Sequence, residues 1–449
     1  MQERLYHRLD SPQAASLLAS LYGQGALESS RYRYKSLITG LCALVSQEVP
    51  EQAGEKASPF RFFTAPGRTE LGGNHTDHNH GKILAASIQL DVVALVLPRA
   101  DKQVLFRSTG YPDVRIDLSD LSPRSSEQGS TEALLRGVAG ELAAQGLPLG
   151  GFTAYADSTV FAGSGLSSSA AIEVLFGTIF DHLYGEGNRS ALELAKIGQK
   201  AENIYFGKPS GLMDQTACAY GGGVLIDFEH EQDPQVQPIH LDMESLGLCL
   251  CVVHTRGNHA DLTPEYAAIP QEMQAVARFF GKSVLRELTG ETLLAHTEAI
   301  RKTLGDRPFL RALHFFEENR RVEAMQEVLE RAKTRSGTAR SAALMRYLRL
   351  VNESGDSSWK LLQNLYVPHN PRDQGLPLAL ALTRSFFETP GKTKFWACRV
   401  HGGGFAGTIQ AYIPLEYLDA YKTLMESVFG PGALTPLKIR SRGAVELVF

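Results

Sequence analysis

The sequence predicts an α+β protein of two domains, and three observations support this fold class. The chain has 449 residues, which is enough for about two or three domains of ordinary size. Segments with helix and strand patterns are mixed along the chain, without the strict alternation of a doubly wound sheet. A charged stretch at 229–237 separates two halves, so we expect an N-terminal domain at 1–235 and a C-terminal domain at 236–449.

In the first half, helix signals and strand signals follow one another. Ser11 and Pro12 are a typical N-cap and first helical residue, and residues 82–97 are rich in apolar residues that favour strands. A polar linker is expected at 48–58. The elements expected are helices at 11–21, 34–45, 131–146, 168–183 and 191–205, and strands at 82–88, 90–97, 151–156 and 224–228.

The second half begins with the apolar run at 248–253, whose alternating small and branched side chains are typical of a strand. Longer segments with apolar residues at helical spacing follow it. The elements expected are strands at 246–255, 394–400, 408–412 and 444–449, and helices at 264–281, 311–332 and 341–353.

Composition excludes several classes of protein. Lys and Arg number 45 and Asp and Glu 49, which gives a net charge of −4, and 43% of residues are hydrophobic. These values exclude disordered and collagen-like chains, and they argue against a nucleic-acid surface. No apolar run is long enough for a membrane span. The beginning of the chain does not resemble a signal peptide, and five scattered cysteines without a CxxC pair favour a reduced, cytoplasmic protein.

A loop of small residues at 161–171 lies between a predicted strand and a predicted helix. Gly163 and Gly165 allow the backbone to approach a ligand, and the serines that follow place hydroxyl and N–H groups at a helix start, where anions bind. The loop is not a Walker A loop, and Ser168 stands where the dinucleotide fingerprint has its third glycine. This pattern predicts either a phosphate site or a tightly packed helix entry.

Polar residues are dense at 65–81, directly before two apolar β runs, which is typical of a functional loop. Asn74, His75 and Asp77 can supply the directional hydrogen bonds that a polyhydroxylated ligand needs. The loop's three histidines and Asp77 are an alternative set of transition-metal ligands, and solvated turn residues are a third interpretation. We expect no tightly bound transition metal, because ligands this close in sequence rarely close a tetrahedron without a distant partner.

Two further segments carry candidate residues. Glu202 lies near a predicted helix end, and Asp214 follows in a loop punctuated by Gly and Pro. Asp214 can accept a hydroxyl proton or can cap the next helix, whereas Glu202 suits a hard cation such as Mg²⁺. Three consecutive glycines at 402–404 predict either close packing or a ligand against the main chain.

Taken in order, these motifs resemble the GHMP family of small-molecule kinases and, within it, the galactokinase subfamily. Residues 66–81 are similar to the sugar-kinase signature Pro-Gly-Arg-Val-Asn-Leu-Ile-Gly-Glu-His-Thr-Asp-Tyr-Asn-x-Gly, and residues 163–171 to the family's phosphate loop. Residues 201–215 match the catalytic segment of the subfamily in spacing. The resemblance covers most of the chain, from 65 to 414.

The resemblance implies two domains with the active site in the cleft between them. It implies transfer of the ATP γ-phosphoryl group, with Mg²⁺, to the anomeric hydroxyl of galactose, giving galactose 1-phosphate. Asp214 would be the base or the group that orients the hydroxyl, and Arg68 would keep Asp214 ionised. The other implied roles are Ser168 and Glu202 for Mg²⁺, Gly163, Gly165, Ser167, Ser168 and Ser169 for the phosphates, and Asn74, His75, Asp77, Gly211 and Tyr266 for the sugar.

The sequence departs from the signature at several positions. Asn74 replaces the glutamate that recognises the sugar, Thr69 and Glu70 replace Val-Asn, and His78 replaces the tyrosine. Asn74 leaves open a kinase for another sugar, such as an N-acetylhexosamine, a uronic acid or a pentose. A silent sugar-sensing paralogue is a third interpretation, which the intact catalytic set disfavours. The expected partners are a small sugar and ATP, with no nucleic acid or membrane, in a monomer or weak dimer.

Overall fold

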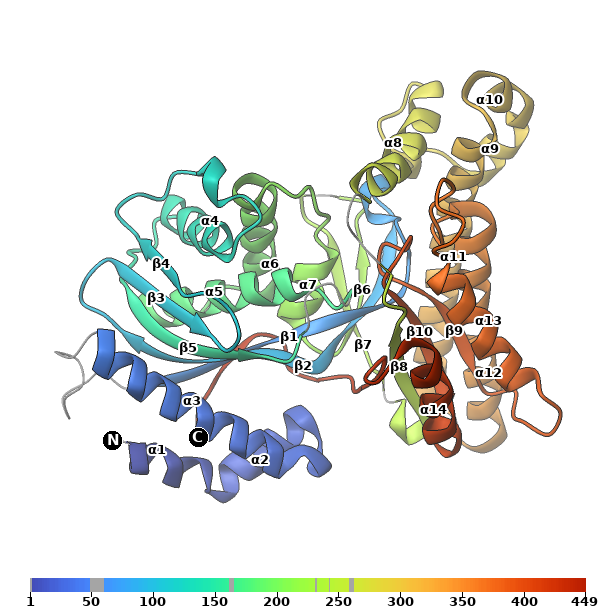
Figure 1. The fold of residues 1–449 in the computed structure, drawn as a ribbon. Coiled ribbons are helices and arrows are strands. Elements are labelled where there is room, and N and C mark those ends of the chain that lie inside the picture. The colour runs from blue at the N-terminus through green and yellow to red at the C-terminus, as the bar shows by residue number, and fades with distance from the viewer. Residues whose placement is uncertain (1, 49–59, 161–164, 231, 242, 258–261) are drawn as a thin grey trace.

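The computed structural model describes residues 2–48, 60–160, 165–230, 232–241, 243–257 and 262–449, and within them the strands form two sheets of eight and four strands (Figure 1). The larger sheet contains β1 (Arg61–Gly72), β2 (Lys82–Pro98), β3 (Gln103–Ser108), β4 (Val114–Asp117), β5 (Phe152–Ser158), β6 (Gly223–Asp227), β7 (Gln235–Ile239) and β12 (Val445–Leu447). The smaller sheet contains β8 (Leu248–His254), β9 (Ala397–His401), β10 (Thr408–Pro414) and β11 (Leu434–Leu437). The predicted α+β class is confirmed.

Most strand pairs are antiparallel. The larger sheet runs in the order β12-β1-β2-β5-β3-β4, with β6 paired to β2 and β7 paired to β6. Only β3 and β5 run parallel among the strands of the described residues. The smaller sheet has the order β11-β8-β10-β9.

Helices cover both faces of the larger sheet (Figure 1). One face carries α1 (Gln2–Leu9), α2 (Pro12–Tyr22) and α3 (Leu27–Glu48), and the opposite face carries α4 (Thr131–Ala144), α5 (Ser168–Tyr184), α6 (Ala191–Lys200) and α7 (Met213–Tyr220). Beside the smaller sheet lie α11 (Asp306–Lys333), α12 (Gly337–Ser357), α13 (Gly375–Glu388) and α14 (Leu418–Phe429), with α8 (Thr263–Phe279), α9 (Gly290–Ala295) and α10 (Thr297–Leu304) at one end.

Strand β2 joins the two β runs that the sequence predicted separately at 82–88 and 90–97. It is one strand whose first part pairs with β6 and whose last part pairs with β5. Val92, Ala94 and Val96 pack toward α4–α7, whereas Val93 and Leu95 pack toward α1–α3. A strand buried on both faces is apolar throughout. The point where β2 changes partner is therefore not visible in the hydrophobic pattern of the sequence.

Residues 61–72 form strand β1, and the prediction of a loop from residue 65 onward was wrong for this part. The register of β1 against β2 shifts between Pro66 and Arg68, as at a β-bulge, and a bulge re-aims the side chains near it. A Cβ atom on Gly67 would lie 2.8 Å from the carbonyl oxygen of Leu166, so only glycine lets β1 come this close to the start of α5. Arg68 therefore reaches the site from a strand.

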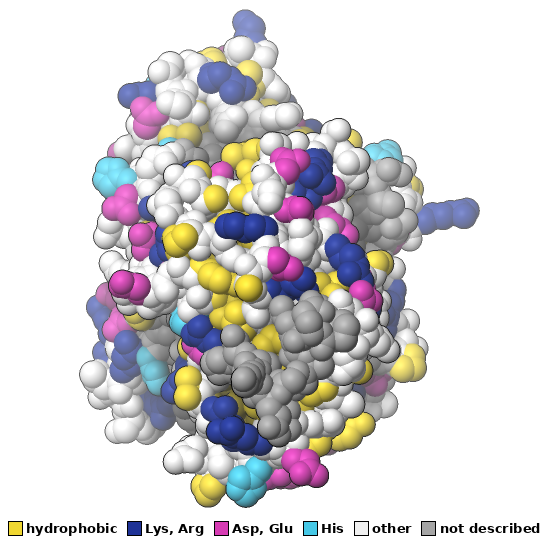
Figure 2. All heavy atoms as spheres, turned by 90° about the vertical axis from the view of Figure 1, so that its left-hand side faces the viewer, with side chains coloured by type: hydrophobic (Ala, Val, Ile, Leu, Met, Phe, Trp, Pro, Cys, Tyr) yellow, Lys and Arg dark blue, Asp and Glu magenta, His cyan; other side chains and the backbone are white. Residues whose placement is uncertain are grey.

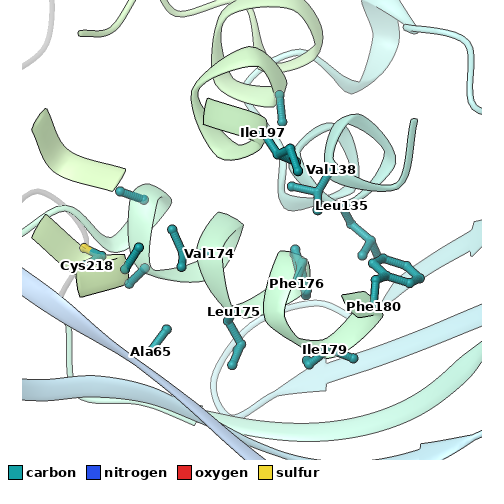
Figure 3. Close-up of a cluster of buried hydrophobic side chains, with 14 of the residues drawn as sticks. Ala65, Leu135, Val138, Val174, Leu175, Phe176, Ile179, Phe180, Ile197 and Cys218 are labelled. Atoms are coloured by element: carbon teal, nitrogen blue, oxygen red, sulfur yellow. The ribbon is translucent and has the colours of Figure 1, made fainter. Parts of the chain in front are cut away.

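An apolar core fixes α5 and its neighbouring helices on the larger sheet (Figure 3). Phe176 and Phe180 of α5 are fully buried, and Ile197 of α6 packs in the same cluster. Cys218 of α7 and Ala65 of β1 lie at the end of this cluster opposite Phe180 (Figure 3). Packing of this density holds the starts of α5 and α7 at fixed positions over β1.

Ser11 caps α2, since its Oγ accepts the backbone N–H of Ala14 at 3.1 Å. Helix α3 is longer than expected, and α1, α7, α9, α10, α13, α14, β3, β4, β7 and β11 were not expected. The predicted linker falls almost wholly at 49–58, outside the described residues. The domain boundary stays a prediction, although β7 and β12 both join the larger sheet.

On the face in Figure 2, Lys and Arg side chains are interspersed with Asp and Glu, so charge of one sign is not gathered there. This distribution agrees with the near-neutral total charge. Among the described residues, no helix combines the length and the apolar character that a membrane crossing requires.

Candidate active site

Arg68 and Asp214 form the central ion pair of the site. The Nε and Nη2 atoms of Arg68 donate to the two carboxylate oxygens of Asp214, each at 2.7 Å. The Nη1 atom of Arg68 also donates to the carbonyl oxygen of Gly165. This bidentate geometry fixes the orientation of the carboxylate as well as its charge.

The carboxyl group of Asp214 is strongly acidic. Burial by itself would raise its pKa, but the charge and hydrogen bonds of Arg68, together with the hydroxyl of Ser167, outweigh burial and lower the pKa to about 2. Asp214 is the second residue of α7 and not its N-cap, which is Leu212. Its carboxylate thus accepts hydrogen bonds from Arg68 and Ser167. The alternative role of Asp214 as a helix N-cap is excluded.

The start of α5 lies beside this ion pair. Ser167 has a φ of 59°, which is unusual for a residue other than glycine, and its hydroxyl donates to Asp214 instead of capping the helix. A Cβ atom on Gly165 would lie 3.1 Å from Thr408 Oγ1 of the smaller sheet. Gly163 lies outside the described residues. The first N–H groups of a helix have no partner within the helix, so the start of α5 is suited to a phosphate.

Glu202 lies in a short π-helical segment, Ala201–Phe206, that follows α6. Segments of this kind are frequent at functional sites. Its buried carboxylate accepts hydrogen bonds from Ser169 Oγ and Lys208 Nζ, both on Oε1 at 2.9 Å. The structure therefore brings Glu202 to Ser169, while Ser168, the first residue of α5, is half-buried.

A second buried carboxylate lies behind Glu202. The amide Nε2 atom of Gln215 donates to Glu202 Oε2 and to Glu173 Oε2, both at 2.9 Å. Burial raises the pKa of Glu173 well above its usual value, and the charge of Glu202 raises it further. A Cβ atom on Gly198 would lie 3.1 Å from the Cβ of Glu173, so this glycine leaves the space for the carboxyl group.

The residues predicted to bind the sugar make contacts at two places. A Cβ atom on Gly211 would lie 2.0 Å from Asp77 Oδ2, so the segment at 201–215 and the loop after β1 touch at this glycine. The Nε2 atom of His75 lies 2.9 Å from the carbonyl oxygen of Gly403, and Tyr266 donates to that of Gly404 at 3.0 Å. These loops belong to different sheets, so the predicted sugar residues meet where the two sheets adjoin.

Asn74 is buried, and its side chain contacts protein groups. Its Nδ2 atom donates to the carbonyl oxygen of Gly402 at 2.7 Å and to Glu70 Oε1 at 3.2 Å, and its Oδ1 atom accepts from Asn364 at 2.9 Å. Glu70 in turn accepts from Arg399 Nη2 at 2.5 Å. Two of the positions that depart from the signature, 70 and 74, are thus direct partners. A role for Asn74 in sugar binding stays a prediction.

Comparisons with known proteins agree with this geometry. Residues 133–222 match the family described as GHMP kinases N terminal domain. Residues 51–98 match the galactokinase galactose-binding signature. A galactokinase of Streptomyces coelicolor is 31% identical over 402 residues, covering 87% of this chain and 95% of the relative. The chain belongs to the galactokinase family of GHMP kinases.

Other galactokinases and GHMP kinases extend this relationship. A galactokinase of Streptomyces lividans is 34% identical over 375 residues, covering 82% of this chain and 85% of the relative. The structure of Lactococcus lactis galactokinase complexed with galactose has a TM-score of 0.73 at 24% identity and covers 91% of this chain and 100% of its own. Methanococcus jannaschii mevalonate kinase has a TM-score of 0.58 at 14% identity, covering 85% and 99%. At these identities the two structures show the shared fold.

Sequence reasoning missed several residues of this galactokinase-family site. Glu173 carried a usable signal, because it is a carboxylate within an apolar stretch of helix, one turn after Ser169. Lys208 lay inside a recognised motif but at a position without an assigned role. Arg399 and Asn364 carried no local signal, since only the tertiary fold brings them to the signature loop.

Proposed function

We propose that this chain transfers the γ-phosphoryl group of ATP to the anomeric hydroxyl of galactose, forming galactose 1-phosphate. The observation that carries the proposal is the Asp214 carboxylate, held by Arg68 and Ser167 between the start of α5 and the signature loop. Family membership supports both the reaction and the substrate.

Phosphoryl transfer requires mainly positioning and electrostatic stabilisation. With a pKa of about 2, Asp214 is an ionised acceptor that orients the sugar hydroxyl and receives its proton late in the reaction. Arg68 stabilises the negative charge that develops on the transferred group. The N–H groups at the start of α5, with the hydroxyls of Ser168 and Ser169, bind the nucleotide phosphates.

The oxygen donors near α5 fit Mg²⁺. Glu202 presents a carboxylate oxygen that already holds a cation, the Lys208 ammonium, and the hydroxyl of Ser169 lies beside it. Hard oxygen donors of this kind are those that Mg²⁺ prefers. We propose Glu202 and Ser168 as its protein ligands. When bound, Mg²⁺ supplies charge neutralisation for the phosphates.

A panel of sugars with labelled ATP tests the proposed reaction. We expect galactose at millimolar concentration to be turned over, with the label in a sugar 1-phosphate. No product from galactose, alongside product from another sugar, would reject galactose as the substrate.

A kinase for a different sugar is the second candidate, and the buried position of Asn74 favours it. The amide of Asn74 binds Gly402, Glu70 and Asn364, whereas the signature has a glutamate at this position for the sugar. The same panel therefore includes N-acetylgalactosamine, galacturonic acid and arabinose. A higher kcat/KM for one of these sugars than for galactose would establish this second candidate.

Arg68→Met is expected to move the acidic limb of the pH profile to higher pH. In the native protein Asp214 stays ionised down to its pKa of about 2, so loss of activity between pH 8 and 5 does not come from this group. Without Arg68, burial raises the pKa of Asp214, and protonation then removes activity at a higher pH. The measurement is kcat/KM from pH 4.5 to 8. Arg107→Met, which breaks a similar pair with Asp113, is the control, and identical profiles for both variants would contradict this role of Arg68.

We place the reaction in the cytoplasm, with a small sugar and ATP as the only substrates. All five cysteines are free, which fits a reducing compartment.

A further inference from the structure

Lys208 reaches a buried carboxylate of the phosphate site from the protein surface. Its Nζ atom lies 2.9 Å from Glu202 Oε1, the same oxygen that accepts from Ser169. The side chain of Lys208 is 55% exposed, whereas that of Glu202 is 2% exposed. A flexible side chain with this exposure can leave the carboxylate without disturbing the core.

The surroundings of Lys208 are strongly acidic. Its ammonium group donates to Glu202, which Gln215 links to the buried carboxyl group of Glu173. At this distance the charge of Lys208 neutralises the carboxylate of Glu202. Arg68 does not replace it, because Arg68 is engaged by Asp214 and Gly165.

A divalent cation bound to Glu202 would compete with Lys208 for this carboxylate. The Oε1 atom of Glu202 has two lone pairs, and Ser169 and Lys208 already donate to it. Mg²⁺ on this oxygen therefore displaces a donor, and repulsion between the two cations makes Lys208 the donor that leaves. The nucleotide phosphates would lie next to the same oxygen, at the start of α5. They offer the released ammonium group a new anion within reach of the same side chain.

We propose that Lys208 is a mobile cation of the phosphate site, which neutralises Glu202 in the metal-free protein and binds a nucleotide phosphate once Mg²⁺ occupies that carboxylate. The proposal rests on the proposed use of ATP. It assigns Lys208 two successive partners, so its removal has opposite effects on the metal and on the nucleotide.

The variant Lys208→Met tests both the competition with the metal and the contact with phosphate, and neither test requires turnover. Titration with Mn²⁺ alone, followed by electron paramagnetic resonance, is expected to show about 2–5-fold tighter binding, because an exposed competing ion pair is removed. Titration with the non-hydrolysable ATP analogue AMPPNP and Mg²⁺, followed by calorimetry, is expected to show about tenfold weaker binding, because a charged hydrogen bond is lost.

Lys200→Met is the matched control. Lys200 pairs with Glu141 at 3.2 Å, and its side chain is 57% exposed. The control substitution therefore removes a similar exposed lysine from an ion pair with a different carboxylate. Unchanged Mn²⁺ binding in Lys208→Met would overturn the competition with the metal, and unchanged AMPPNP binding would overturn the contact with phosphate. Failure of the wild-type protein to phosphorylate galactose would reject the proposed substrate while leaving both binding measurements interpretable.

Discussion

Asp214→Asn is expected to lower kcat by about 10²–10⁴-fold, with a much smaller change in the affinity for the sugar. The amide keeps the size of the side chain and one acceptor for Arg68, but it cannot receive the hydroxyl proton. Arg68 then faces a neutral partner, so the charge that stabilises the transferred group is also less well placed. Steady-state kinetics with galactose and ATP measure kcat and KM separately.

Asp113→Asn is the matched control for this variant. Asp113 forms a bidentate pair with Arg107 at 2.6 and 2.7 Å, and its side chain is 25% exposed, the same fraction as that of Asp214. It lies between β3 and β4, in a part of the larger sheet separate from the site. If both variants lost the same activity, or if Asp214→Asn kept wild-type kcat, Asp214 would have no catalytic role.

Arg399→Met is expected to lower the free energy of unfolding by about 3–5 kcal/mol, because it leaves the carboxylate of Glu70 buried without its cation. The side chains of Arg399 and Glu70 are 0% and 4% exposed. Burial raises the pKa of Glu70, and the charge of Arg399 acts against this effect. Urea unfolding, followed by circular dichroism, measures the loss.

The double variant Glu70→Gln/Arg399→Met is expected to recover most of this stability, because it removes both buried charges together. Arg384→Met serves as the exposed control, since Arg384 and Glu388 are 68% and 54% exposed and a pair of this kind contributes about 1 kcal/mol or less. A double variant as unstable as Arg399→Met alone would show that the loss comes from packing and not from the unpaired charge.

Much of the fold was predictable where one helix face or one sheet face is buried. Residues 168–183 showed the small and apolar pattern of α5, and Ser11 marked the start of α2. Strand β1 was hidden because its Pro, Gly and charged residues are typical of a loop, yet the chain stays extended through a register shift there. Strand β2 was divided in two because its change of partner does not alter an apolar pattern.

Much of the predicted site was already contained in the motifs. The separation of Arg68, Ser167 and Asp214 in the sequence is large, but each lies in a segment with its own signature, so the resemblance placed them together and the structure shows their contacts. The pairing of Ser169 with Glu202 was not predicted, because the direction of neighbouring serines at a helix start depends on the exact turn.

The sequence by itself determined the fold class, the family and the identity of the central ion pair, because local motifs with fixed spacing encode them. Only the tertiary structure decided that Asn74 lies against Glu70, that Arg399 neutralises Glu70, and that Lys208 reaches Glu202. Arg399 is 329 residues from Glu70 along the chain, and no local pattern records such a contact. The physical reason is burial: a charge removed from water requires a partner, and the packing of the two sheets, not the neighbouring sequence, provides it.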